Sequence, residues 1–229
     1  NDATSEGLYI YTGPSVPSVV VGDDVTIFGT LIEYRAGGDT STSLTLTEIN
    51  PAILIQVNSS GNSTPQMVFL DSSVRNPPQA VIEDDATGDV ETSGVFDPSL
   101  DGIDFWESLE GMLVMLPSPV AVGPTDDFGS NREIPVVGPL ATERTPSGGI
   151  VVRQADFNPE RIILNDWIKD VPTLPSVDVG QQLGPTAEGV VDYSFNNYKV
   201  QVTIVYPPGG GGPAKETTSP AGPGEIAVA

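Results

Sequence analysis

Glycine and proline occur along the whole chain, and they constrain the fold more strongly than any other feature of the sequence. The 229 residues include 25 glycines and 22 prolines, a content that predicts many turns and irregular connections. No segment has the pattern of a helix of three turns. The best helical pattern is Phe105–Met112, and Gly111 soon ends it.

The remaining apolar residues follow the pattern of short β-strands. Ser43–Ile49 alternates Leu and Ile with Thr and Glu, which is typical of a half-buried strand. Val25–Phe28 and Tyr198–Tyr206 are rich in β-branched and aromatic residues. The dipeptide Asn196-Asn197 predicts a hairpin turn, because Asn tolerates a positive φ. The predicted fold class is all-β.

The charge balance excludes several classes of function. The chain has no His and no Cys, and its nine Lys and Arg face 31 Asp and Glu, a net charge of −22. The usual general base near neutral pH and the usual thiol nucleophile are therefore absent. So acidic a surface repels nucleic acids and anionic lipids, and no apolar run approaches the ~18 residues that cross a bilayer. We expect no enzyme and no membrane insertion, but an extracellular structural or binding role.

Carboxylates gather in one turn-rich stretch, which we call the acidic segment (residues 71–104). Carboxylate oxygens suit hard cations, above all Ca²⁺. The spacing is not that of an EF-hand loop, and a solvated acidic loop explains the stretch equally well. At Asp126-Asp127 a simple turn is the favoured alternative. The candidate calcium ligands are Asp84, Asp85, Asp89, Asp97, Asp101, Asp104, Asp126 and Asp127.

An ordered series of segments resembles a known family. The series is Asp2–Tyr11, Val21–Tyr34, Asp101–Val114, Glu133–Gly138, Gly149–Arg153 and Val177–Val200. It resembles the non-catalytic, tandem OB-like region of large secreted bacterial nucleases of the endonuclease/exonuclease/phosphatase superfamily. The resemblance implies two OB-like β-barrels in tandem. It implies a first domain over residues 1–96, a second over 97–206, and a Pro/Gly-rich tail over 207–229.

Two departures from this family suggest how the chain acts. The strand pair that precedes the Asp2–Tyr11 motif in the family is missing here, so the first barrel would have an open edge. Glu225–Ala229 resembles the opening strand of the nuclease domain, so none of that domain's catalytic residues can be carried over. An open edge is a template for another strand, and Ala221–Ala229 is a candidate donor. We therefore expect an extracellular homo-oligomer or filament, joined by strand or tail exchange and by calcium-bridged acidic loops.

The alternative function is that of an accessory nucleic-acid-binding region of a secreted nuclease. OB folds bind single strands through aromatic platforms beside basic side chains. A third possibility is an inert spacer. The candidate nucleic-acid contacts are Arg144, Arg153, Arg161, Tyr193, Phe195 and Tyr198.

Overall fold

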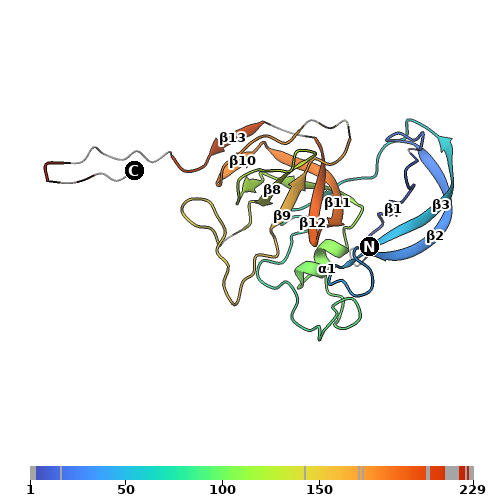
Figure 1. Ribbon diagram of the computed structural model, residues 1–229, viewed down its shortest axis with the longest axis horizontal. Helices are drawn as coiled ribbons and strands as arrows, with labels where there is room; N and C mark the ends of the chain where they lie inside the picture. Colours follow the sequence, from blue (N-terminus) through green and yellow to red (C-terminus); the bar gives the residue numbers. More distant parts are fainter. Residues whose placement is uncertain are drawn as a thin grey trace.

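The all-β prediction is confirmed by a computed structural model, which describes residues 4–15, 17–141, 143–169, 171, 173–204, 207–214, 222–224 and 226. The described residues form thirteen strands and one short helix. The strands lie in two separate sheets, one at each side of the helix in Figure 1. No helix among the described residues is long and apolar enough to cross a membrane.

The smaller sheet is built from the N-terminal part of the chain, which we call the arm (residues 8–59). It contains β1 (Tyr9–Ile10), β2 (Asp24–Arg35) and β3 (Thr45–Ser59) in the order β1-β3-β2. β2 and β3 form a long antiparallel hairpin, and β1 runs parallel to β3. The hairpin curves outward at one end of the molecule (Figure 1).

The larger sheet forms the body (residues 68–211). Its path runs β13-β10-β6-β8-β9-β12-β11-β5-β4, and β7 pairs with β8 at the side of this path. The bounds are β4 (Val68–Phe69), β5 (Leu113–Pro117), β6 (Val120–Ala121), β7 (Asp126–Asp127), β8 (Arg132–Val137), β9 (Ile162–Asn165), β10 (Gln181–Leu183), β11 (Thr186–Ser194), β12 (Asn197–Ile204) and β13 (Pro208–Gly211).

Neither sheet closes into a barrel among the described residues, so the tandem OB-like barrels are not seen. The path of the body sheet ends at β4 and at β13, which do not pair with each other. β4 has only two residues and β13 is three-quarters glycine, so both offer short edges. β4 precedes residue 97, where the second domain was predicted to begin, yet it pairs with β5 of the body.

The hydrophobic core lies entirely in the body. Every member of the core cluster among the described residues falls between Leu70 and Val202, and the arm contributes none. The helix α1 (Gly102–Glu107) supplies Phe105 and Trp106 to this core. It begins three residues earlier than the sequence pattern predicted. After it, Gly111 has a φ of +69°, a conformation that glycine adopts without strain.

The hairpin between β11 and β12 turns one residue earlier than predicted. Phe195 and Asn196 have φ values of 52° and 61°, while Asn197 pairs with Ser194 as part of the ladder. A two-residue turn with positive φ at both positions matches the right-handed twist of the strands. The predicted donor segment Ala221–Ala229 lies largely outside the described residues, as do Asn1 and Asp2.

Candidate functional site

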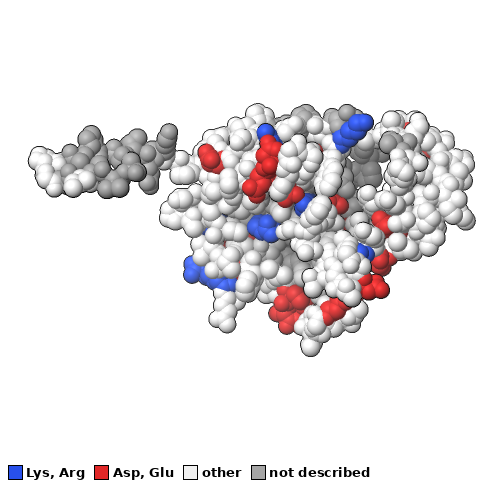
Figure 2. Space-filling model, in the orientation of Figure 1, with Lys and Arg blue, Asp and Glu red and all other residues white. Residues whose placement is uncertain are grey.

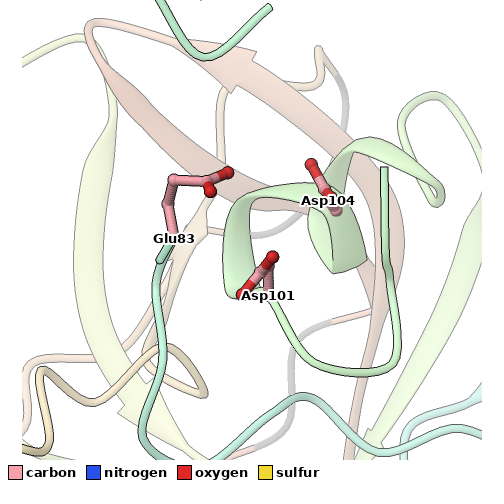
Figure 3. A group of neighbouring side chains, drawn as sticks. All are labelled: Glu83, Asp101 and Asp104. Carbon is pink, nitrogen blue, oxygen red and sulfur yellow. The ribbon is translucent and has the colours of Figure 1, made fainter. Parts of the chain in front are cut away.

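Three carboxylates meet beside the start of α1. Glu83, Asp101 and Asp104 each offer one oxygen, and these oxygens lie within 4.8 Å of one another. Figure 3 shows the three side chains converging, with Glu83 on the irregular chain that precedes the helix and the two aspartates at the beginning of the helix. The structure thus brings together Asp101 and Asp104, which the sequence predicted as ligands, with a third acid from 18 residues earlier.

Two backbone hydrogen bonds create this meeting. The N–H of Gly102 donates to the carbonyl of Val81 over 3.1 Å, and the N–H of Ile103 donates to that of Ile82 over the same distance. The first turn of α1 is thereby joined to the irregular chain just before Glu83. The indole N–H of Trp106 donates to the carbonyl of Pro159, which anchors the helix in the body.

Asp101 is buried without the partners that a carboxylate needs. It is 3% exposed, and its Oδ1 has no hydrogen-bond partner in the described part of the chain. It is the N-cap residue of α1, yet its side chain makes no capping bond. Burial, together with the nearby charges of Glu83 and Asp84, raises the pKa of Asp101 to about 6.

Asp104 is also buried but has one partner. Its Oδ2 accepts a hydrogen bond from the backbone N–H of Asp97 over 2.6 Å. Burial raises the pKa of Asp104, and this hydrogen bond opposes the rise. Burial is thus the main cause of the raised pKa of both acids, and neighbouring carboxylates add to it.

A cleft of about 650 Å³ opens beside the cluster. Glu83 and Asp104 line it from the body, and Glu33, Arg35 and Thr47 line it from the arm. Arg35 is an ion-pair partner of Glu91 and lies 3.7 Å from Asp89. The cleft therefore gives solvent a route to the carboxylates, and its one arginine is already paired.

The other predicted ligands in the acidic segment do not join the cluster. Asp84, Asp85 and Asp89 are exposed. Asp85 accepts a hydrogen bond from the N–H of Val95. The Oδ1 of Asp97 accepts from both the N–H and the hydroxyl of Ser99, which lowers the pKa of Asp97. These acids shape the turns of the segment and surround the cluster with negative charge.

Asp126 and Asp127 form β7 at the side of the body sheet. Both are exposed. Asp127 pairs with Arg132 at 3.0 Å and accepts a hydrogen bond from the N–H of Gly129, and these contacts lower the pKa of Asp127. The pair is thus a short strand followed by a turn.

The predicted nucleic-acid contacts are spread over different environments. Arg144 donates to the carbonyl of Gly148, and Arg153 pairs with Glu143 at 2.9 Å. Burial lowers the pKa of Arg161. The three arginines thus differ in their local contacts.

The three predicted aromatic contacts also lie in different environments. The rings of Tyr193 and Tyr198 are 4.9 Å apart and largely buried. Tyr193 accepts a hydrogen bond from the N–H of Leu44, and Tyr198 donates to Glu107. Phe195 is 70% exposed and stacks on Trp167, with ring centroids 5.7 Å apart.

Sequence reasoning missed three residues that the structure makes prominent. Trp167 was not singled out, although a second exposed aromatic is needed for a stacked pair. Glu83 was noticed only as one acid among many. Glu110 was not among the candidate residues, and burial raises the pKa of Glu110 to about 8. A buried Glu between Leu109 and Gly111 carries no signal in its spacing.

The arrangement defines an all-β protein whose acidic cluster lies beside a short helix on the body. The chain belongs to the family described as a domain of unknown function (DUF8508), whose model matches residues 69–208. This match covers nearly the whole body and leaves the arm outside it. No curated protein and no solved structure matches the chain. The resemblance to secreted nucleases stays a prediction.

Proposed function

We propose that the chain is a non-catalytic, extracellular assembly module and that its arm binds a second copy of the chain. The observation that carries this proposal is the exposure of large apolar side chains on a sheet that has no core of its own. Phe28 is 66% exposed and Ile53 is 70% exposed. Such residues are buried in most monomeric proteins, and a contiguous apolar patch marks an interaction surface.

The exposed apolar residues occupy both faces of the hairpin. Phe28 pairs with Leu54 on one face, and Ile53, the neighbour of Leu54 along β3, lies on the other face; all three are exposed. Directly paired residues share a face and successive residues alternate. The exposed set on the arm is Leu8, Tyr9, Tyr11, Val19, Val20, Val21, Phe28, Leu31, Tyr34, Ile53, Leu54 and Val57.

The area of this set suits a protein interface. From the usual size of such side chains, the exposed apolar area is on the order of 1,000 Å². A standard interface buries about 800 Å² per partner, and the largest apolar patch on a typical monomer is roughly 300–600 Å². Because the set occupies both faces of the arm, its total equals one side of a standard interface only when both faces are covered.

Charge favours a second copy over an anionic partner. Residues 25–32 of β2 and 49–58 of β3 contain no charged side chain, although the chain as a whole carries −22. Figure 2 shows the arm almost free of charged side chains on the face in view. Two arms can therefore meet without bringing like charges together, whereas nucleic acid would find no cations there.

The position of β2 at the edge of its sheet also favours a second copy of the chain as the partner. β2 lies at the edge of the order β1-β3-β2, so its outer backbone groups are a template for another strand. An identical strand from a second copy is complementary in both hydrogen bonding and apolar pattern.

Sedimentation velocity over a range of concentrations tests this proposal. We expect concentration-dependent association of the wild type, and its loss in the double variant Phe28→Ser/Leu54→Ser. The matched control is Phe128→Ser/Leu140→Ser, which removes the same residue types from exposed positions of the body and should associate like the wild type. A wild type that stays monomeric with and without millimolar Ca²⁺ would overturn the proposal.

A further inference from the structure

We propose that Glu83, Asp101 and Asp104 form a binding site for a divalent cation, and that this cation is Ca²⁺. One oxygen from each residue lies within 4.8 Å of the others. Ca²⁺ binds oxygen at about 2.4 Å, so two ligands on opposite sides of one ion are about 4.8 Å apart. These separations are compatible with one ion lying between the three carboxylates.

The unpartnered carboxylate of Asp101 is the independent observation that points to a ligand. Its Oδ1 is buried without a hydrogen-bond partner among the described residues, and the residue is 97% buried. An N-cap aspartate normally accepts a hydrogen bond from the first turn of its helix, but Asp101 does not. In Figure 3 its side chain is close to those of Glu83 and Asp104 instead. A bound cation would satisfy this oxygen.

The chemistry of the donors favours Ca²⁺. The chain has neither His nor Cys, so softer metals lack their usual ligands. Three carboxylates leave several positions of a six- to eight-coordinate ion for water or carbonyl oxygens, and Ca²⁺ tolerates such irregular sets. Mg²⁺ requires near-octahedral geometry and loses its water reluctantly, so it serves as the competing ion in the test.

The position of the site determines how an ion reaches it and which parts of the chain the ion would link. Glu83 and Asp104 line the cleft between arm and body, so an ion can arrive from solvent. The exposed Asp84 and Asp85 nearby raise the local concentration of cations. A bound ion would link Glu83 to the start of α1, beside the hydrogen bonds of Gly102 and Ile103 to the carbonyls of Val81 and Ile82.

Isothermal titration calorimetry of the EDTA-treated full chain with CaCl₂, together with the Tm in the same buffers, tests the site. We expect saturable binding of Ca²⁺ that millimolar Mg²⁺ does not abolish, and a rise in Tm on binding. Asp101→Asn should weaken this binding roughly tenfold or more, because it removes one of three anionic ligands. Asp178→Asn, an equal charge change at an exposed position, should bind Ca²⁺ like the wild type.

The Tm of Asp101→Asn without Ca²⁺ distinguishes a loss of binding from a loss of folding. Asp101→Asn removes a buried, unpartnered charge, so it should fold at least as well as the wild type without Ca²⁺ while losing the Ca²⁺-induced rise. Glu83→Gln should lose the same rise. A wild type without heat or Tm shift at millimolar Ca²⁺, or an Asp101→Asn variant that binds like the wild type, would overturn the site. The arm residues that carry the assembly proposal are different, so either proposal can fail alone.

Discussion

The arm and the body are both built from alternating apolar strands, yet they bury their side chains very differently. In the body, Val114, Ile134 and Val136 are completely buried. In the arm, Leu31 and Ile53 remain mostly exposed. Alternation along a strand predicts that one face is apolar, but it does not say what covers that face. The comparison teaches that strand pattern and burial are separate properties.

The cause is the presence or absence of a second layer. The body sheet is covered by α1, whose Phe105 and Trp106 enter the core, and the following Leu109 is completely buried. No member of that core cluster among the described residues comes from the arm, and a sheet of two or three strands is marginal on its own. The family match follows the same division, because residues 69–208 form the body.

The largest expected effect comes from removing core volume in the body. Leu109→Ala should lower the free energy of unfolding by about 2–5 kcal/mol, because a completely buried leucine leaves a cavity. Ile53→Ala in the arm should change it by less than about 0.5 kcal/mol. Urea unfolding, at a concentration where the chain is monomeric, measures both. Equal costs at the two positions would mean that the arm has a covering layer in solution.

The junction between the two regions should make stability depend on pH. Glu110 of the body accepts a hydrogen bond from the N–H of Thr47 in the arm, and its Oε2 is buried without a partner in the described part of the chain. Burial raises the pKa of Glu110 to about 8, and the facing charges of Glu107, Glu33 and Asp192 add to the rise.

A raised pKa in the folded state favours folding at low pH. The contribution of Glu110 is complete below its ordinary value near 4.5 and is lost as the pH rises through about 8. The free energy of unfolding should therefore fall between pH 5 and pH 9, by on the order of 4 kcal/mol from this group. Glu110→Gln should flatten that part of the pH profile, and an unchanged slope would mean that the carboxyl is solvated.

The strands of the arm could be predicted from sequence, but their lengths could not. Val25–Phe28 was expected to lie in a strand, and the structure extends that strand to Arg35 in β2. The register shifts around Gly29 show that an irregularity absorbs the interruption within one strand. Periodicity detects each apolar run, whereas a bulge is visible only once the partner strand is known.

The candidate cation site could also be predicted from the sequence only in part. Asp101 and Asp104 are three residues apart, so one turn of helix brings them together, and both were among the eight candidate ligands of the sequence. Glu83 joins them only through the contacts of Val81 and Ile82 with the start of α1. Such a non-local contact has no signature in a single sequence, because irregular chain has no period from which to infer its path.

The smallest expected effect concerns the contacts of Glu91 of the body with the arm. Glu91 accepts hydrogen bonds from the N–H and the hydroxyl of Thr45 over 2.5 and 2.6 Å, and it also pairs with Arg35. Glu91→Gln removes the charge from this partly exposed group, which should cost about 1 kcal/mol. Because the core lies elsewhere, the loss should be local: the amides of β3 next to Thr45 exchange hydrogen faster, while those of β11 and β12 keep their protection. Asp89→Asn is the matched control, since Asp89 lies farther from Arg35, at 3.7 Å, and should change exchange less. Faster exchange throughout the body in the Glu91 variant would show that arm and body unfold as one unit, and the division drawn here between them would be wrong.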